Sequence, residues 1–111
     1  MDIDLFSVKK TAENCALNQC RFVSVSQADI LNFKPVRQYD VVIANVLTVV
    51  ILEALSTLVS VVAPNGFLVL SGIGIQWRQD VIEAVQATGF NVVESWEKDG
   101  WVCLVSTERN G

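Results

Sequence analysis

Polar residues stand at the carboxyl ends of three predicted strands: Asp2 and Asp4 at the first, Asp29 at the second and Asn45 at the third. In open α/β sheets, ligands bind at these strand ends. A carboxylate there can accept hydrogen bonds from ribose hydroxyls, and an acid one strand over can accept from an adenine amino group. Asn45, in "DVVIANVLTVVILEAL", adds an amide with two donors and an acceptor. The three positions together indicate a site for a nucleoside-like small molecule.

Each of these residues also has an ordinary structural explanation. Asp4 is placed to cap a helix, because its carboxylate can accept from free N–H groups of the first turn. Asp29 fits a loop or another cap, by the usual preference of aspartate for turns. Asn45 could cap the helix that follows it, a role compatible with ligand binding.

The elements that would position these side chains alternate between helix and strand. Apolar residues at spacings of three and four predict a first helix, with Leu5, Val8, Ala12 and Cys15/Ala16 on its buried side. "RFVSVSQADI" then predicts a short strand. "YDVVIAN" is a β-branched run without alternation, which is typical of a strand covered on both faces of a parallel sheet.

The second half continues the same alternation. A helix is expected from about Leu47 to Ala63, stopped by "PNG", and "FLVLSG" is a second buried strand. A further helix carries a stripe of Trp77, Val81, Ala84/Val85 and Thr88, closed by Gly89. "NVVESWEK" and "WVCLVST" predict a hairpin around Asp99-Gly100. We therefore expect one α/β domain over residues 1–111, mostly parallel, with a C-terminal antiparallel hairpin.

Composition narrows the class of partner. The net charge is −4 with a pI near 4.6, and no run of Lys/Arg is present, so we expect no nucleic-acid partner. No signal peptide or membrane span is expected. Histidine is absent, and Cys15, Cys20 and Cys103 lack the spacing of a zinc site or disulfide framework. We expect no metal, reduced thiols and a cytoplasmic location.

Several motifs resemble one family. "DIDLFSVKKTAENCALN" looks like the stretch after the second strand of class I S-adenosylmethionine methyltransferases, in particular the bacterial ribosomal protein L11 methyltransferases. "DVVIANVL" resembles the "ANIL" element of that family, and "LVLSGI" with "GWVCLV" resembles its last strands. The resemblance covers nearly the whole chain in the right order, and its Asn-containing element and "SGI" are its most specific parts.

The resemblance implies a Rossmann-like sheet that binds S-adenosylmethionine, with a ribosomal protein as substrate. Asp2 would bind the ribose hydroxyls and Ile3 would pack on the adenine. Asp29 and Ile30 would line the adenine pocket. Asn45 would be the catalytic residue, beside the methionine part of the cofactor and the incoming amine, where aligning the amine with the methyl carbon supplies most of the help.

The main departure from the family is an absence. The chain begins at the second strand, so we expect the central first strand, the glycine-rich loop after it and a substrate-recognition domain to be missing. We therefore expect a truncated C-terminal portion that binds cofactor weakly or not at all and is inactive alone. Strand edges would then need a partner, either another strand of the same chain or a second copy in a homodimer.

Two other interpretations remain open. The chain could be a non-catalytic relic or interaction module with no cofactor binding. It could also be another nucleotide-binding α/β protein, such as half of a dehydrogenase, but "SGIGI" lacks the glycine spacing which that class requires.

Overall fold

The structure, a computed structural model, describes residues 21–26 and 37–108. The first predicted helix lies outside these residues, as do Asp2, Ile3, Asp4, Asp29 and Ile30. The described elements are β1 (Phe22–Ser26), β2 (Tyr39–Asn45), α3 (Thr48–Ser60), β3 (Val62–Gly74), the 3₁₀ turn η1 (Ile75–Trp77), α4 (Arg78–Ala87), β4 (Phe90–Lys98) and β5 (Trp101–Glu108).

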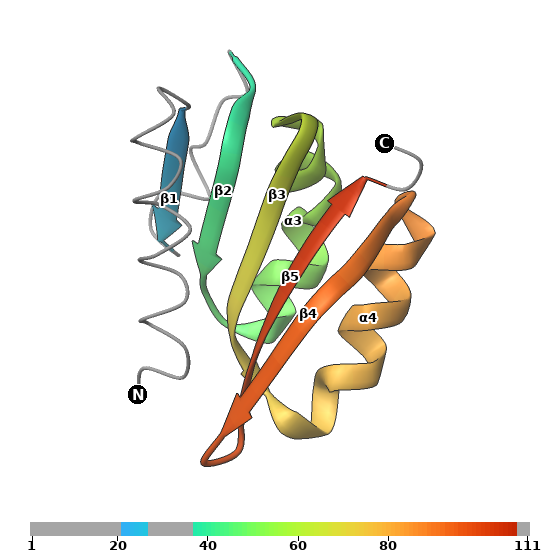
Figure 1. Cartoon of the computed structure of the whole chain (residues 1–111). Helices are drawn as coiled ribbons and strands as arrows, with labels where there is room; N and C mark the ends of the chain where they lie inside the picture. The colour runs from blue at the N-terminus through green and yellow to red at the C-terminus, as the bar shows by residue number, and fades with distance from the viewer. Residues whose placement is uncertain (1–20, 27–36, 109–111) are drawn as a thin grey trace.

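The five strands form one mixed sheet in the order β1-β2-β3-β5-β4. The pairs β1/β2 and β2/β3 are parallel, and the pairs β3/β5 and β4/β5 are antiparallel. Figure 1 shows α3 and α4 side by side on one face of this sheet. The predicted α/β class with a C-terminal antiparallel hairpin is confirmed.

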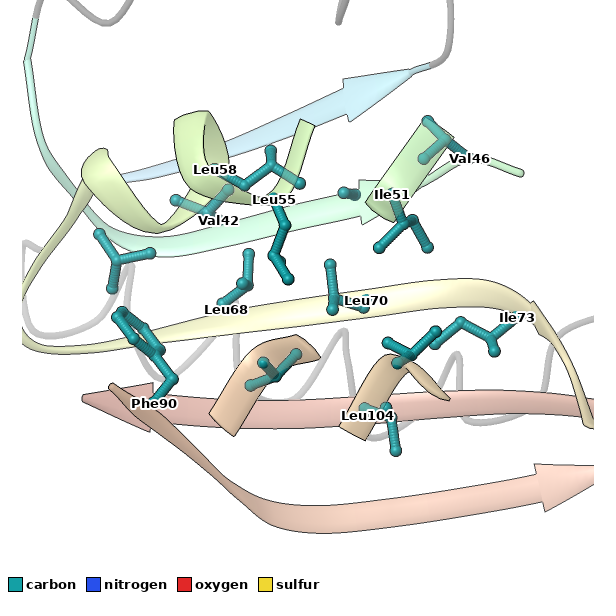
Figure 2. Close-up of a cluster of buried hydrophobic side chains, with 14 of the residues drawn as sticks. Val42, Val46, Ile51, Leu55, Leu58, Leu68, Leu70, Ile73, Phe90 and Leu104 are labelled. Carbon is teal, nitrogen blue, oxygen red and sulfur yellow. The ribbon is translucent and has the colours of Figure 1, made fainter. Parts of the chain in front are cut away.

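The largest core cluster fills the space between the sheet and these two helices. Helix α3 buries one stripe, Ile51, Leu55 and Leu58, and α4 buries Val81 and Val85. Figure 2 shows the α3 residues facing side chains from the strands, among them Val42, Leu68 and Leu70, and Ile73 and Leu104 belong to the same cluster. Spacings of three to four on the helices and of two on the strands bring these residues onto facing surfaces.

Helix α3 ends earlier than the sequence predicts. The helix stops at Ser60, and β3 begins at Val62, which pairs with Tyr39 of β2. The backbone N–H of Tyr39 donates to the carbonyl of Val61 at 2.7 Å, so the chain joins the sheet before the "PNG" segment. The turn expected there exists as an irregularity inside β3, where Asn65 has a φ of 67°.

The C-terminal hairpin is formed as predicted. Strands β4 and β5 pair up to Lys98 and Trp101, which leaves Asp99 and Gly100 as a two-residue turn. Their φ values are 51° and 85°. Positive φ at both central positions is the signature of a type I′ turn, and it explains why an Asp-Gly pair stands there.

Strand β1 pairs directly with β2, from Phe22 opposite Val41 to Ser26 opposite Asn45. At the start of this pair, the N–H of Arg21 donates to Oδ2 of Asp40 at 2.8 Å, and the N–H of Asp40 donates to the carbonyl of Arg21 at 2.7 Å. The backbone groups along this edge of β2 are thus paired with another strand of the same chain, which is the first of the two arrangements expected. The homodimer stays a prediction.

A search of the described helices found none with the length and apolar character needed to cross a membrane.

Candidate functional site

The carboxyl ends of β1, β2 and β3 lie together at one edge of the sheet. Asn45, the last residue of β2, is opposite Ser26 of β1 and Ser71 of β3. In Figure 1 these three strands run in the same direction, and the turn between β4 and β5 extends beyond the same end. Asn45 therefore occupies the position at which parallel sheets bind ligands.

The side chain of Asn45 lies against Gly72. A Cβ atom added to Gly72 would stand 3.0 Å from Oδ1 of Asn45 and 3.0 Å from the carbonyl oxygen of Val46. Gly72 has a φ of 84°, and the pairing of β3 with β5 shifts register between Leu70 and Ile73. The glycine thus lets β3 bend and lets the Asn45 amide rest close to its backbone, as bulges beside functional sites commonly do.

Asn45 is not the cap of α3. The N-cap of that helix is Leu47, which has extended backbone angles, and no side chain makes the capping hydrogen bond. Within residues 21–26 and 37–108, no side-chain hydrogen bond of Asn45 is found, and the residue is exposed. The structural alternative for Asn45 therefore does not hold, and its amide faces solvent at the sheet edge.

A cavity of about 500 Å³ opens beside this edge. It lies between the start of α3, η1 and the beginning of β5, and it is lined by Leu47, Thr48, Val49, Leu52, Gly72, Gly74, Gln76, Trp77 and Trp101. Gly72 belongs both to this lining and to the contact with Asn45, so the amide stands next to the cavity.

Two hydrogen bonds hold the walls of the cavity in place. The N–H of Gly74 donates to the Thr48 hydroxyl at 3.3 Å, which joins β3 to the first residue of α3. The N–H of Ile75 donates to the carbonyl of Gly100 at 2.9 Å, which joins η1 to the hairpin turn. The two tryptophans are thereby carried on segments that are fixed to the sheet.

The tryptophan walls are the feature that the sequence did not predict. The helical spacing assigned Trp77 to the buried stripe of α4, and that assignment is wrong: Trp77 precedes the helix and is 47% exposed. Trp101 is 44% exposed. Both tryptophans lie near the carboxyl end of β3, because Trp77 ends the turn that follows β3 and Trp101 begins the strand that pairs with it. The sequence alone does not show this proximity, because it depends on how the strands pair.

The chemistry available to the described part of this site is binding and positioning. Every described residue that lines the cavity is uncharged at neutral pH, so none can serve there as a general acid or base. The described residues also contain no group of three or more His, Cys, Asp or Glu side chains arranged to hold a metal ion. The cofactor contacts expected from Asp2, Ile3, Asp29 and Ile30 lie outside the described residues.

Solved structures share this fold. A ribosomal protein L11 methylase from Lactobacillus delbrueckii subsp. bulgaricus superposes with a TM-score of 0.66 at 18% identity, covering 73% of this chain and 41% of that one. The fibrillarin pre-rRNA processing protein of Methanococcus jannaschii gives 0.58 at 16% identity, over 76% and 42%. At such identities the likeness concerns the fold.

Sequence comparison identifies the family as well as the fold. Ribosomal protein L11 methyltransferases of Geobacter metallireducens and Desulfosudis oleivorans are 36% and 38% identical over 106 and 114 residues. These matches cover 94% and 96% of this chain but 34% and 36% of the relatives, so the chain spans about a third of their length. The family model described as "Ribosomal protein L11 methyltransferase (PrmA)" matches residues 1–109, and the chain therefore belongs to the ribosomal protein L11 methyltransferase family.

Proposed function

We propose that this chain forms the C-terminal part of the catalytic domain of an enzyme that methylates an amino group of a ribosomal protein in the cytoplasm, with S-adenosylmethionine as methyl donor. The observation that carries the proposal is the position of Asn45: an exposed amide at the carboxyl end of a parallel strand, packed against Gly72, in a chain of this family. A protein substrate, and no nucleic acid, fits an acidic chain with net charge −4.

Asn45 would act by positioning the amine. S-adenosylmethionine, when bound, would supply the methyl group. Methyl transfer is an in-line displacement that needs a neutral amine aligned with the methyl carbon, and alignment supplies much of the rate enhancement. The Oδ1 atom of Asn45 can accept a hydrogen bond from an amine N–H, and its NH₂ group can donate to the cofactor. This division of roles requires no titratable side chain at the described edge.

The described residues fit only one end of such a cofactor. They offer the Asn45 amide at the strand ends, whereas the ribose and adenine contacts are expected from Asp2, Ile3, Asp29 and Ile30. A glycine-rich backbone cradle after a strand is not among the described segments. We accordingly expect the 111-residue chain by itself to bind S-adenosylmethionine no better than millimolar, about −4 kcal/mol, and to show no transferase activity.

A second candidate is a non-catalytic interaction module. The observation in its favour is the direct pairing of β1 with β2. In the family, by resemblance, the first strand stands between the second strand, expected at Met1–Asp4, and the strand that corresponds to β2. A sheet whose backbone groups are already paired along this edge of β2 has less need of a complementing part.

A chimera separates the two candidates. The corresponding C-terminal third of the Geobacter metallireducens relative is replaced by this chain, and transfer of labelled methyl groups from S-adenosylmethionine to ribosomal protein L11 is measured. The proposal predicts turnover, and it predicts that Asn45→Ala lowers turnover by one or more orders of magnitude, the scale of losing a positioning contact. Val93→Ala, on an exposed residue of β4, serves as the matched control.

A folded chimera that neither binds the cofactor nor transfers a methyl group would favour the interaction module. Equal turnover of the unmodified chimera and of its folded Asn45→Ala variant would remove Asn45 from the mechanism.

A further inference from the structure

Strand β1 is held beside β2 mainly by backbone pairing. We propose that β1 is exchangeable, and that its place beside β2 is the docking surface for a parallel strand from the upstream part of the enzyme. The inference deepens the proposed function by naming how the two parts join, and it rests on that function for the identity of the partner. The chain spans about a third of its relatives, so such a partner carries the other two thirds.

The core anchors the two strands unequally. Val42 and Ala44 of β2 belong to the large core cluster, and Val41 belongs to the smaller cluster on the opposite face of the sheet. Among the β1 side chains that the structure describes, the half-buried Val23 packs against the large cluster, whereas the buried Val25 is a member of neither cluster. Side-chain packing therefore fixes β2 on both faces and fixes β1 weakly.

The two strands also differ in the pattern of their side chains. The run from Val41 to Ala44 is apolar on both faces, which is typical of a strand inside a parallel sheet. Strand β1 instead alternates, and its exposed Ser24 stands opposite the half-buried Ile43. An apolar strand in place of β1 would cover Ile43 better, so β2 favours such a partner over the strand that it has.

The connection between the strands is long enough for β1 to move outward. About a dozen residues, 27–38, lie between β1 and β2. Such a segment can reach roughly 40 Å when fully extended. The return along the seven residues of β2 requires about 23 Å, and each added strand requires about 4.8 Å more across the sheet. An inserted strand would also take over the backbone groups of β2, so no edge of β2 stays unpaired.

The other edge of the sheet is protected against such addition. Figure 1 shows β4 at the edge opposite β1. Strand β4 exposes Glu94, Glu97 and Lys98, and its pairing with β5 shifts register after Val92. Charges and bulges on an edge strand prevent further pairing. A parallel strand beside β2 would also bring its own carboxyl end to the edge where Asn45 lies.

Disulfide trapping tests whether β1 leaves β2 when the upstream part is present. Ser24→Cys and Ile43→Cys place two thiols at paired positions of β1 and β2. The pair is introduced into the 111-residue chain and into the chimera, with Cys15→Ser and Cys20→Ser in both and the buried Cys103 retained.

We expect the disulfide within most molecules of the chain alone and at least tenfold less of it in the chimera. One inserted strand would separate the two positions by about 10 Å, beyond the roughly 7 Å that a disulfide tolerates between Cα atoms. The control pair is Asn91→Cys with Thr107→Cys in the hairpin, which should form its disulfide equally in both proteins. Peptide mapping by mass spectrometry identifies the linked residues.

A second measurement uses the chain alone and tests whether β1 is separable. Val25 of β1 and Val42 of β2 are both almost completely buried. We expect Val25→Asp to retain a cooperative urea transition with a lowered midpoint, because β1 detaches and the remaining sheet persists, and Val42→Asp to abolish the transition. Tryptophan fluorescence reports on the remaining sheet, since the three tryptophans lie in η1, β4 and β5.

The inference would be overturned by an equal yield of the β1–β2 disulfide in the folded chimera, or by loss of the urea transition in Val25→Asp. Disulfides that join two copies of the chain alone would also overturn it, because a second copy would then occupy the edge of β2. These readouts are independent of activity. An inactive chimera without the β1–β2 disulfide would retain the exchange and remove the proposed function, and an active chimera with that disulfide would do the reverse.

Discussion

Replacing Gly72 by alanine probes the contact that defines the candidate site. The substitution introduces one methyl group at the edge where Asn45 meets β3. It acts in two ways: it places a side chain on a backbone with a φ of 84°, and it brings a Cβ to 3.0 Å from Oδ1 of Asn45 and from the carbonyl of Val46.

The two effects have different sizes. A non-glycine residue in the left-handed region costs about 1–2 kcal/mol. Cβ contacts at 3.0 Å require the neighbouring atoms to move, and one of the two neighbours here is backbone, which yields less readily than a side chain. Overpacking of this kind costs about 1–3 kcal/mol. We therefore expect Gly72→Ala to lower the free energy of unfolding by about 2–5 kcal/mol.

Gly89→Ala is the matched control. Gly89 has a φ of 95°, and a Cβ there would meet no atom within 4 Å. Gly89→Ala should therefore lower the free energy of unfolding only by the cost of placing a side chain on a backbone with positive φ. Urea unfolding followed by tryptophan fluorescence gives both values, with the midpoint shifted and the m value unchanged if only stability changes.

A double mutant tests whether Asn45 causes the extra loss of stability in Gly72→Ala relative to Gly89→Ala. Asn45→Ala removes one of the two atoms that the new methyl group meets, so it should recover part of the loss in Gly72→Ala but none of the loss in Gly89→Ala. If Gly72→Ala and Gly89→Ala were equally destabilising, Asn45 would not pack against Gly72 in solution, and the site geometry described above would be wrong.

Two further predictions concern the scaffold. Gly100→Val should lower the free energy of unfolding by about 2 kcal/mol in urea melts, because a β-branched residue resists the φ of 85° that the hairpin turn requires; a loss below about 0.5 kcal/mol would count against the type I′ turn. Leu58→Ala, at a side chain with no exposed surface, should cost about 2–5 kcal/mol in the same assay, and Leu52→Ala, 39% exposed on the same helix, should cost well under half of that. Equal losses would mean that α3 does not pack by the described stripe.

Local patterns were sufficient to predict much of the fold. The β-branched run ending at Asn45, the apolar stripe of α3 and the Asp-Gly turn each depend on neighbours close in sequence, and each appears as predicted. The end of α3 was misplaced because a tertiary contact decides it: Tyr39 bonds to Val61 and draws the chain into the sheet before Pro64.

The site was only partly predictable for the same reason. Asn45 could be singled out because an amide at the end of an apolar strand is unusual wherever that strand lies. The tryptophan walls depend on long-range pairing, since Trp101 reaches the cavity only because β5 runs back antiparallel to β3 and pairs opposite Gly74. Helical spacing assigned Trp77 to the core. The turn that carries Trp77 is instead tied to the hairpin by the hydrogen bond between Ile75 and Gly100, which are distant in sequence, and Trp77 is exposed there.

Calorimetric titration with S-adenosylhomocysteine, run on the 111-residue chain and on the chimera side by side, tests most directly whether the described residues form one part of a shared cofactor site. We expect the chimera to bind in the micromolar range and the chain alone to show no saturation below about 1 mM. Saturable binding of the chain alone at low micromolar concentration would contradict this, because Asn45 and the strand ends of this segment would then suffice to hold the cofactor.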